Sequence, residues 1–319
     1  MVVVQGVTHR YPGRRKVPPR TAVASLDLHV PEGGFVVLTG PNGGGKSTLF
    51  RILSGLQRPS EGRVRVAGVD LFQEPAQARR AMGVVFQKPA LDPHLTVREN
   101  WIVHGELYGM GRRLIRERLD ESLSWSDLGG RLDDRVGTLS GGLARQAELV
   151  KAMLHHPRLL LMDEPTTGLD PGSREAFLTT LVSLRRDRGV TLFMTSHLFS
   201  EAEAASAVAI LHQGRLLALE TPDRLRSALG ETMLVIHTDD RPGLAASLRE
   251  EGAGVTVTER GGAFLVSGVP EPAVLMEKLW ARHGKSIRDL AIKRPSLEDC
   301  FIHLTRSSTF EESDPENPS

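Results

Sequence analysis

The sequence predicts an α/β fold followed by a smaller α+β region, and three observations lead to this prediction. Short apolar stretches alternate with helical patterns through the first two thirds of the 319 residues, which is typical of a sheet flanked by helices. The stretch RLLLMDEP, residues 158–165, is apolar up to its acidic end, as expected for a strand buried on both faces. Near Thr221-Pro222 the pattern changes to short strands separated by two helices.

The first region begins with strands. Alternating apolar residues in 2–11 and 24–30 and an apolar run in 33–40 are bounded by Pro- and Gly-containing turns, which indicates strands. A basic loop, residues 13–20, follows the first strand. This loop is either simply solvated or a contact for lipid headgroups or a partner.

Helices and strands then alternate. We expect helices over 48–56, within 96–128, after Ser140, over 173–187 and over 200–205, and strands over 62–68, 83–87, 158–163, 190–197 and 207–215. In the second region we expect strands over 233–238, 254–259, 263–268 and 287–293, and helices over 243–252 and 273–284. The predicted domains are residues 1–225, with a helical part at about 88–139, and residues 230–305, followed by a disordered acidic tail, 306–319.

Composition excludes several classes of protein. The formal net charge is +1, so composition indicates no nucleic-acid partner. Cys300 is the single cysteine, which rules out an intrachain disulfide and fits a reducing cytoplasm. No apolar run approaches the length of a membrane span, and the N-terminal stretch lacks the pattern of a signal peptide. Any work at a membrane therefore needs a separate membrane protein.

The stretch GPNGGGKST, residues 40–48, matches the pattern G-x-x-x-x-G-K-[ST] between a predicted strand and a predicted helix. Glycines let backbone N–H groups approach phosphate oxygens, and the helix start adds partial positive charge. A glycine-rich turn before an ordinary helix is the alternative, which this context disfavours. The predicted nucleotide-binding residues here are Gly40, Asn42, Gly43, Gly44, Gly45, Lys46, Ser47 and Thr48.

Two acidic residues stand at the end of the buried strand of residues 158–163: Asp163 is its last residue and Glu164 follows directly. Asp163 at that position could hold a Mg²⁺ that bridges the terminal phosphates. Glu164 could polarise a water molecule for attack on the γ-phosphate. Taken alone, the DEP sequence is equally consistent with a charged turn. Downstream of a phosphate-binding loop, the catalytic interpretation is favoured.

A third stretch, TLSGGLARQAEL at residues 138–149, places Ser-Gly-Gly at the start of a predicted helix. Such a helix start is a second potential anion site, although a Ser N-cap with a flexible entry would look the same. One ATP γ-phosphate does not need two such sites from one chain. Two chains arranged head-to-tail would supply one each.

These stretches, in this order, resemble the ATP-binding cassette (ABC) superfamily over about residues 1–225. The resemblance also includes Tyr11 in HRYPG, Gln87 in VVFQ, the TTGLDP run through Asp170, and His197 in MTSH. It implies a P-loop ATPase core with an inserted helical subdomain and a small C-terminal α+β appendix. It also implies that ATP and Mg²⁺ are bound, with Ser47, Gln87 and Asp163 near the metal.

The resemblance assigns a role to each matching residue. Tyr11 would stack on adenine, Glu164 would act as general base, His197 would clamp the γ-phosphate, and Gln87 would approach Mg²⁺ and the attacking water. Ser140, Gly141 and Gly142 would contact the ATP held by a second subunit, and Asp170 would tie the subunits together. Because both halves of this composite site are intact, we expect a homodimer, with a heterodimer of related subunits as the alternative.

The resemblance further implies a separate multi-spanning permease, with this chain on the inner face of the cell membrane and no direct substrate contact. EPTTGLDP and the C-terminal IKRPSLEDCF are similar to the type-2 export branch, whose members export drugs, antibiotics or polysaccharides. Cassette ATPases of translation or DNA repair are the alternative, but they usually carry two cassettes or a long coiled coil. Trp101, Ile102, Leu107 and Tyr108 form either a docking patch for the permease or the core of the helical subdomain.

Overall fold

The computed structural model describes residues 1–13, 18–230, 232–250 and 255–311. Half of the predicted basic loop, residues 14–17, therefore lies outside the described residues. The chain divides into two compact units, Met1–Leu219 and Glu220–Ser319, and each is considered by itself below.

The first unit contains an antiparallel sheet near its N-terminus. Its order is β2-β1-β4-β5, formed by β1 (Val2–Tyr11), β2 (Arg20–Val30), β4 (Glu61–Val66) and β5 (Val69–Asp70). Val2 and Val4 of β1 are buried, because alternate residues of a strand point to one face, and Val7 is buried after an irregularity in the pairing of β1 with β2. Strand β2 begins earlier than the sequence pattern predicts.

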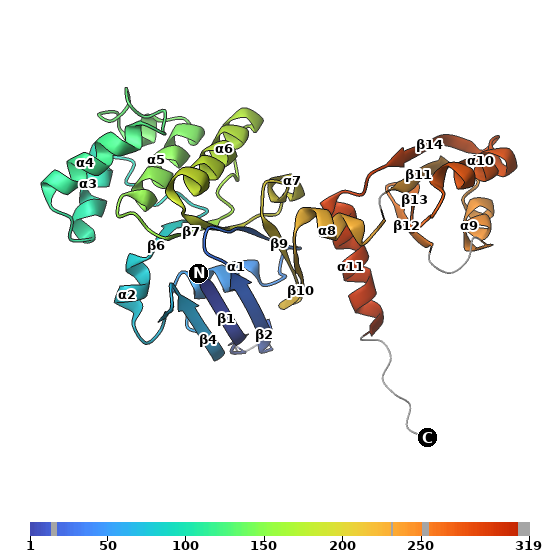
Figure 1. The fold of residues 1–319 in the computed structure, drawn as a ribbon, viewed down its shortest axis with the longest axis horizontal. Helices are drawn as coiled ribbons and strands as arrows, with labels where there is room; N and C mark the ends of the chain where they lie inside the picture. Colours follow the sequence, from blue (N-terminus) through green and yellow to red (C-terminus); the bar gives the residue numbers. More distant parts are fainter. Residues whose placement is uncertain (14–17, 231, 251–254, 312–319) are drawn as a thin grey trace, which may run out of the picture. The chain divides into compact units, whose positions relative to one another are not determined.

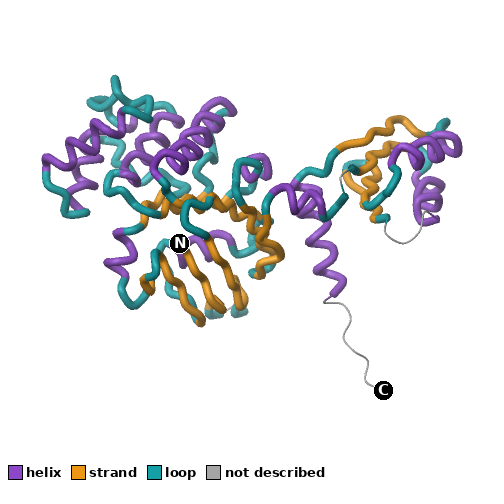
Figure 2. The backbone as a smooth tube through the Cα atoms, in the orientation of Figure 1, coloured by secondary structure: helices purple, strands orange, loops and turns teal. Residues whose placement is uncertain are grey.

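A six-stranded sheet lies at the centre of the first unit (Figures 1 and 2). Its order is β10-β9-β3-β8-β7-β6, with β3 (Phe35–Thr39), β6 (Met82–Val85), β7 (Leu159–Asp163), β8 (Thr191–Thr195), β9 (Ala207–His212) and β10 (Arg215–Glu220). The strands from β9 to β6 pair in parallel, and every residue of β3 and β8 is buried. The carboxyl ends of β3, β7 and β8 therefore share one edge, where ligands of such sheets bind.

Helices connect and cover the central sheet. Helix α1 (Lys46–Leu53) follows β3, and its Leu49 and Ile52 join a core cluster with Val4 of β1 and Phe193 of β8. Helix α6 (Pro171–Arg188) leads to β8, and two short helices, α2 (Pro75–Arg80) and α7 (Phe199–Ala202), complete the connections. The alternating α/β prediction is thus confirmed.

The helical part of the first unit contains α3 (Val97–Leu107), α4 (Arg112–Leu123) and a 3₁₀ turn (Val136–Thr138). Helix α5 (Gly141–Met153) follows it and packs against it. Trp101 is fully buried in the core of the helical part, and its indole Nε1 donates to the carbonyl of Ala147 at 2.8 Å. Ile102 packs against the same cluster. Trp101 is therefore part of the core of the helical subdomain. Leu107 is 79% exposed and is not part of that core.

Two buried histidines in this region predict a dependence of stability on pH. Burial lowers the pKa values of His104 and His155 to about 4. Because the unfolded pKa is near 6.5, folding stability is complete above that pH and decreases as pH falls toward 4. We expect the free energy of unfolding to drop by about 2 kcal/mol or more between pH 6.5 and about 5.

Chemical denaturation across this pH range measures the dependence. His155→Gln should flatten the slope, because one of the two groups no longer binds a proton on unfolding. His94→Gln, at an exposed position, is the matched control. An equal slope in wild type and His155→Gln would contradict the expectation.

The second unit is an antiparallel sheet with two helices in the order β-α-β-β-α-β. Its elements are β11 (Met233–Thr238), α9 (Arg241–Glu250), β12 (Thr256–Arg260), β13 (Ala263–Ser267), α10 (Pro272–His283) and β14 (Ile287–Lys293). The strand order β12-β13-β11-β14 is that of a ferredoxin-like split unit.

Two further helices, α8 (Pro222–Ser227) and α11 (Leu297–Glu311), contact each other in this unit. Helix α11 continues past residue 306, where the sequence predicts the disordered tail to begin, and residues 312–319 lie outside the described part. None of the described helices is long and apolar enough to cross a bilayer.

Candidate functional site

The glycines of the predicted phosphate-binding loop are required by the backbone. Gly40 (φ 146°) would place a Cβ 2.0 Å from the carbonyl oxygen of Leu211, and Gly45 (φ 109°) would place one 2.4 Å from that of Ala22. Gly43 also has a positive φ of 79°, which L side chains rarely adopt. The loop between β3 and α1 is therefore packed against neighbouring backbone on one side, and only glycine fits.

Substitution of Gly40 tests this packing. Gly40→Ala should lower the free energy of unfolding by about 3 kcal/mol, because its methyl group would overlap backbone atoms that cannot rotate away. Gly111→Ala is the control, since its added Cβ meets nothing within 4 Å. Urea denaturation of both variants measures the difference, and equal stabilities would contradict the assignment of Gly40 as a packing position.

Lys46 fills the interior of this loop. Its Nζ donates to the carbonyl oxygens of Gly40 at 2.6 Å and Pro41 at 3.1 Å, and the residue is 5% exposed. Burial lowers the pKa of Lys46, and the nearby charges of Glu164 and Asp163 oppose that shift. A buried ammonium at the start of a helix is suited to binding an anionic phosphate group.

Tyr11 lies beside the start of α1. Its hydroxyl is 3.3 Å from Thr48 Oγ1 and donates to Gln57 Oε1 at 3.1 Å. Ser47, in contrast, is exposed. The structure thus brings the predicted adenine-stacking residue next to the predicted phosphate-binding loop, although 37 positions separate Tyr11 from Thr48.

Thr195 of β8 contacts both acidic residues at the end of β7, Asp163 and Glu164. Thr195 Oγ1 donates to Asp163 Oδ1 at 2.6 Å and accepts from the backbone N–H of Glu164 at 2.9 Å. Burial raises the pKa of Asp163, while the bond from Thr195 lowers it. Glu164 has a positive φ of 42°, an unusual conformation for a residue with a side chain. Thr195 was not predicted, because only the register of β7 with β8 places it here.

Gln87 and His197 both reach the Glu164 side chain. Gln87 Nε2 donates to Glu164 Oε2 at 3.0 Å, and His197 Nδ1 lies 3.5 Å from the same oxygen. Thr167 Oγ1 also donates to it, at 3.3 Å. Three predicted site residues from three separate segments therefore meet at one carboxylate.

The Ser-Gly-Gly stretch and Asp170 lie at two other helix starts. Ser140 caps α5 by accepting from Leu143 N at 3.3 Å, and Asp170 caps α6 by accepting from Ser173 N at 3.0 Å. A Cβ on Gly142 would lie 2.8 Å from Ser173 Oγ, so these two helix starts adjoin. Among the described residues, no hydrogen bond joins Ser140, Gly141, Gly142 or Asp170 to the phosphate-binding loop.

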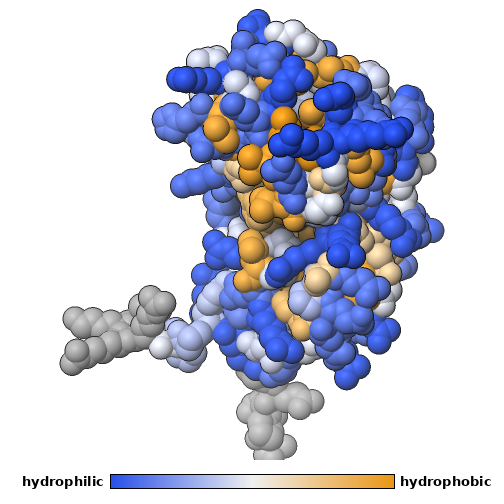
Figure 3. Space-filling view, turned by 90° about the vertical axis from the view of Figure 1, so that its left-hand side faces the viewer, coloured by the Kyte–Doolittle hydropathy of each residue, from blue (hydrophilic) through white to orange (hydrophobic). Residues whose placement is uncertain are grey.

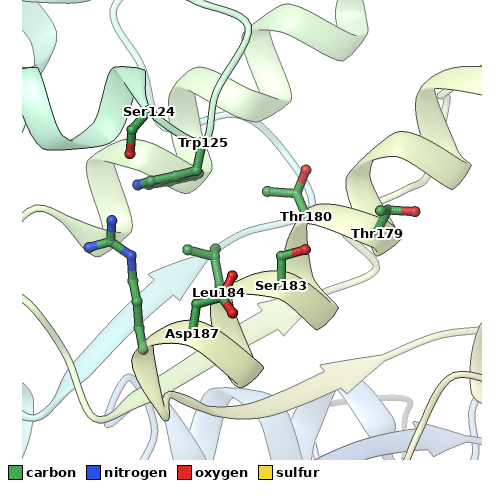
Figure 4. Close-up of a pocket in the computed structure, with 8 residues that line it drawn as sticks. Ser124, Trp125, Thr179, Thr180, Ser183, Leu184 and Asp187 are labelled. Atoms are coloured by element: carbon green, nitrogen blue, oxygen red, sulfur yellow. The ribbon is translucent and has the colours of Figure 1, made fainter.

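Some hollow surfaces of the described residues lie away from this site. Figure 4 shows one of about 420 Å³ between α6 and the segment after α4, in which Trp125 faces the side chains of α6. It is lined by Ser124, Trp125, Thr179, Thr180, Ser183, Leu184, Asp187 and Arg188. None of these residues belongs to the predicted site, so this hollow is separate from it.

Comparison with known proteins matches most of the chain to the ABC family that the sequence motifs resemble. Residues 23–167 match the family model described as ABC transporter. A Nod factor export ATP-binding protein I from a Rhizobium species is 36% identical over 288 residues, covering 90% of this chain and 92% of that protein. The daunorubicin resistance ATP-binding protein DrrA2 of Streptomyces coeruleorubidus is 34% identical over 306 residues, covering 91% and 92%.

Solved structures of ATP-binding cassettes are similar to about 70% of this chain. A dimeric ATP-binding cassette in a post-hydrolysis state, bound to ADP and phosphate, superposes with a TM-score of 0.62 at 29% identity. It covers 69% of this chain and 98% of that one. CbiO1 of Clostridium perfringens, at 23% identity and a TM-score of 0.64, shares the fold.

Proposed function

Because the chain belongs to the ATP-binding subunits of ABC transporters, which hydrolyse ATP for transport, we propose that it drives export through a separate permease on the inner face of the cell membrane. Two observations support export. The relatives matched over nine tenths of this chain are named for Nod factor export and daunorubicin resistance. Because the first unit ends at Leu219, matches over 288 and 306 residues must extend into the C-terminal unit, which carries the PSLEDCF sequence. A role in translation or DNA repair has no comparable support.

The observation that carries the catalytic proposal is the meeting of Gln87 and His197 at Glu164 Oε2. We assign Glu164 as the general base, which accepts a proton from the water that attacks the γ-phosphate. Gln87 and His197 hold that carboxylate and water in place. Lys46 stabilises the negative charge on the transferred phosphoryl group, because its ammonium is fixed inside the loop before the substrate arrives.

Binding of the nucleotide is assigned to the surrounding residues. Backbone N–H groups of Gly43, Gly44 and Gly45 and the start of α1 would bind the phosphates, and Tyr11 would stack on adenine. The described residues contain no cluster of three or more acidic, His or Cys side chains able to hold a metal. Mg²⁺ usually takes one or two protein carboxylates together with substrate phosphates and water. Asp163, Ser47 and Gln87 would hold it, and it would neutralise phosphate charge.

Subunits of this family dimerise and pair with a permease. We propose that two copies of this chain form the dimer. In it, Ser140, Gly141 and Gly142 of one copy contact the ATP bound by the other, and Asp170 lies at the interface. The exposed starts of α5 and α6 support this assignment. Ser140 and Asp170 bond within their own helix starts and not to the phosphate-binding loop of the same chain.

The permease is proposed to dock on the helical part of the first unit. Leu107 is 79% exposed, and Val103, Tyr108 and Leu114 are also exposed. Between α3 and α4 lies a hollow of about 330 Å³, lined by three apolar residues and four charged ones: Ile102, Ile115, Leu119, Arg98, Glu106, Arg112 and Arg116. Figure 3 views the side on which α3 and α4 lie in Figure 1, and shows hydrophobic side chains at the surface among hydrophilic ones.

Leu107→Glu tests this docking surface. We expect the variant to lose most of the permease that co-purifies with it, because a charge replaces a buried apolar contact. ATP hydrolysis by the separate subunit should stay within about twofold of wild type, since Leu107 is remote from the loop. Val182→Glu, at an exposed apolar position on α6, is the control. Unchanged recovery of the permease would contradict this docking surface.

The proposed function is tested by purifying the tagged chain from its native membranes and identifying what accompanies it. A multi-spanning membrane protein at equal stoichiometry is the expected result. Recovery only from the soluble fraction, with ribosomes or DNA, would overturn the transport role and leave the ATPase chemistry intact.

A further inference from the structure

Helix α5 holds the loop that carries Gln87. Arg145 of this helix donates from Nη1 to the carbonyl oxygen of Phe86 at 2.7 Å and from Nη2 to that of Gln87 at 2.8 Å. Arg145 is only 4% exposed. Figure 1 shows α5 beside β6, whose end leads into this loop. The planar guanidinium is suited to binding two adjacent carbonyl groups at once.

Two more charged side chains on the same face of α5 hold the far end of this loop. Glu148 Oε1 accepts from the backbone N–H of Ala90 at 2.8 Å, and Lys151 Nζ donates to the carbonyl of Ala90 at 2.9 Å. Positions 145, 148 and 151 are spaced three apart and therefore lie along one side of the helix. Glu148 is fully buried and Lys151 is 8% exposed.

The three side chains form a buried ionic group. Arg145 Nη1 lies 2.8 Å from Glu148 Oε2, and Lys151 Nζ lies 3.9 Å from Glu148 Oε1. Burial raises the pKa of Glu148 and lowers those of Arg145 and Lys151. Removing such charges from water is costly, and apolar side chains often stabilise a fold equally well. A role in fixing the loop explains why charged groups occupy these positions.

Phe86, at the start of the loop, also packs edge-on against Phe50, with ring centroids 6.1 Å apart, and against the core of the first unit. Within the described part of the chain, no backbone–backbone hydrogen bond outside the helices and strands involves residues 86–90. The Gln87 side chain leaves this loop to donate to Glu164 Oε2. The position of the Gln87 amide at the carboxylate therefore depends in part on where Arg145 of α5 holds the Gln87 backbone.

We propose that Arg145, Glu148 and Lys151 are positioning residues, which fix residues 86–90 so that Gln87 reaches Glu164. Through them, α5 links Ser140 at its first turn to the reacting groups of the same chain. This inference rests on the proposed roles of Gln87 and Glu164. It adds residues that act through Gln87 and do not touch the nucleotide.

A double-mutant cycle of Arg145→Met and Gln87→Ala in the full-length chain tests the proposal. We expect Arg145→Met to lower kcat for ATP by about 10- to 100-fold, because displacing a group by about 1 Å can cost that much. KM for ATP should change by less than about threefold. The double variant should be no slower than Gln87→Ala alone, because Arg145 acts only through Gln87. Arg145→Lys should recover part of the lost kcat.

The controls separate this role from a general loss of structure. Arg113→Met, at an exposed ion pair, should leave kcat unchanged, and thermal unfolding is recorded for every variant. If Arg145→Met fails to fold, Lys151→Met enters the same cycle with a smaller expected loss of about threefold. A folded Arg145→Met chain with wild-type kcat, or losses that multiply in the double variant, would overturn the proposal. A normal kcat for Gln87→Ala would instead refute the proposed role of Gln87 itself.

Discussion

Replacing Glu164 with glutamine should lower kcat for ATP hydrolysis by about 100- to 1,000-fold, because the amide cannot accept the proton of the attacking water. The amide occupies nearly the same volume, and hydrogen bonds from Gln87 and Thr167 can still reach its oxygen. Affinity for ATP should therefore stay within about threefold of wild type. Steady-state hydrolysis and equilibrium nucleotide binding measure the two quantities separately.

Glu117→Gln is the matched control for this variant. Glu117 is an exposed carboxylate on α4, paired with Arg113, so its loss should change neither quantity. A Glu164→Gln chain that retains more than a tenth of wild-type kcat would show that another group accepts the proton.

Replacing Lys46 with alanine should act on binding as well as on hydrolysis. The ammonium is fixed by the carbonyls of Gly40 and Pro41, so it meets the phosphates at little cost in side-chain entropy. Loss of a charged hydrogen bond should weaken ATP binding by about 10- to 100-fold. Hydrolysis should fall further, because charge on the phosphoryl group grows in the transition state.

The control for Lys46→Ala is Lys285→Ala, an exposed lysine of the second unit. Binding is measured with ATP and ADP, and folding is checked by thermal unfolding. A Lys46→Ala chain that binds ATP as tightly as wild type would contradict the proposed phosphate site.

The sequence predicts those parts of the site that are local in the chain. The loop of residues 40–48 could be identified because its glycines, Lys46 and the following helix lie within one short segment. Resemblance to a family predicted that Gln87 lies near Mg²⁺ and the attacking water, whereas its contact with Glu164, 77 positions away, was not predicted. No periodicity or spacing indicates which side chain of one strand faces another.

Residues that support the site were missed for the same reason. Thr195 contacts Asp163 and Glu164 only because β7 and β8 pair in parallel with Asp163 opposite Thr195. Arg145 was not predicted as a site residue, and it is buried against the loop of Gln87. Trp101 could be either core or docking surface until the packing of α3 against α5 placed it inside.

We propose above all that two copies of this chain share each ATP through the Ser-Gly-Gly stretch. Light scattering of the Glu164→Gln chain with ATP, with ADP and without nucleotide tests it most directly. We predict a dimer with ATP alone, and a monomer with ATP when Ser140→Arg is added to Glu164→Gln. A Glu164→Gln chain that stays monomeric with ATP, or a Ser140→Arg double variant that still dimerises, would contradict the shared site.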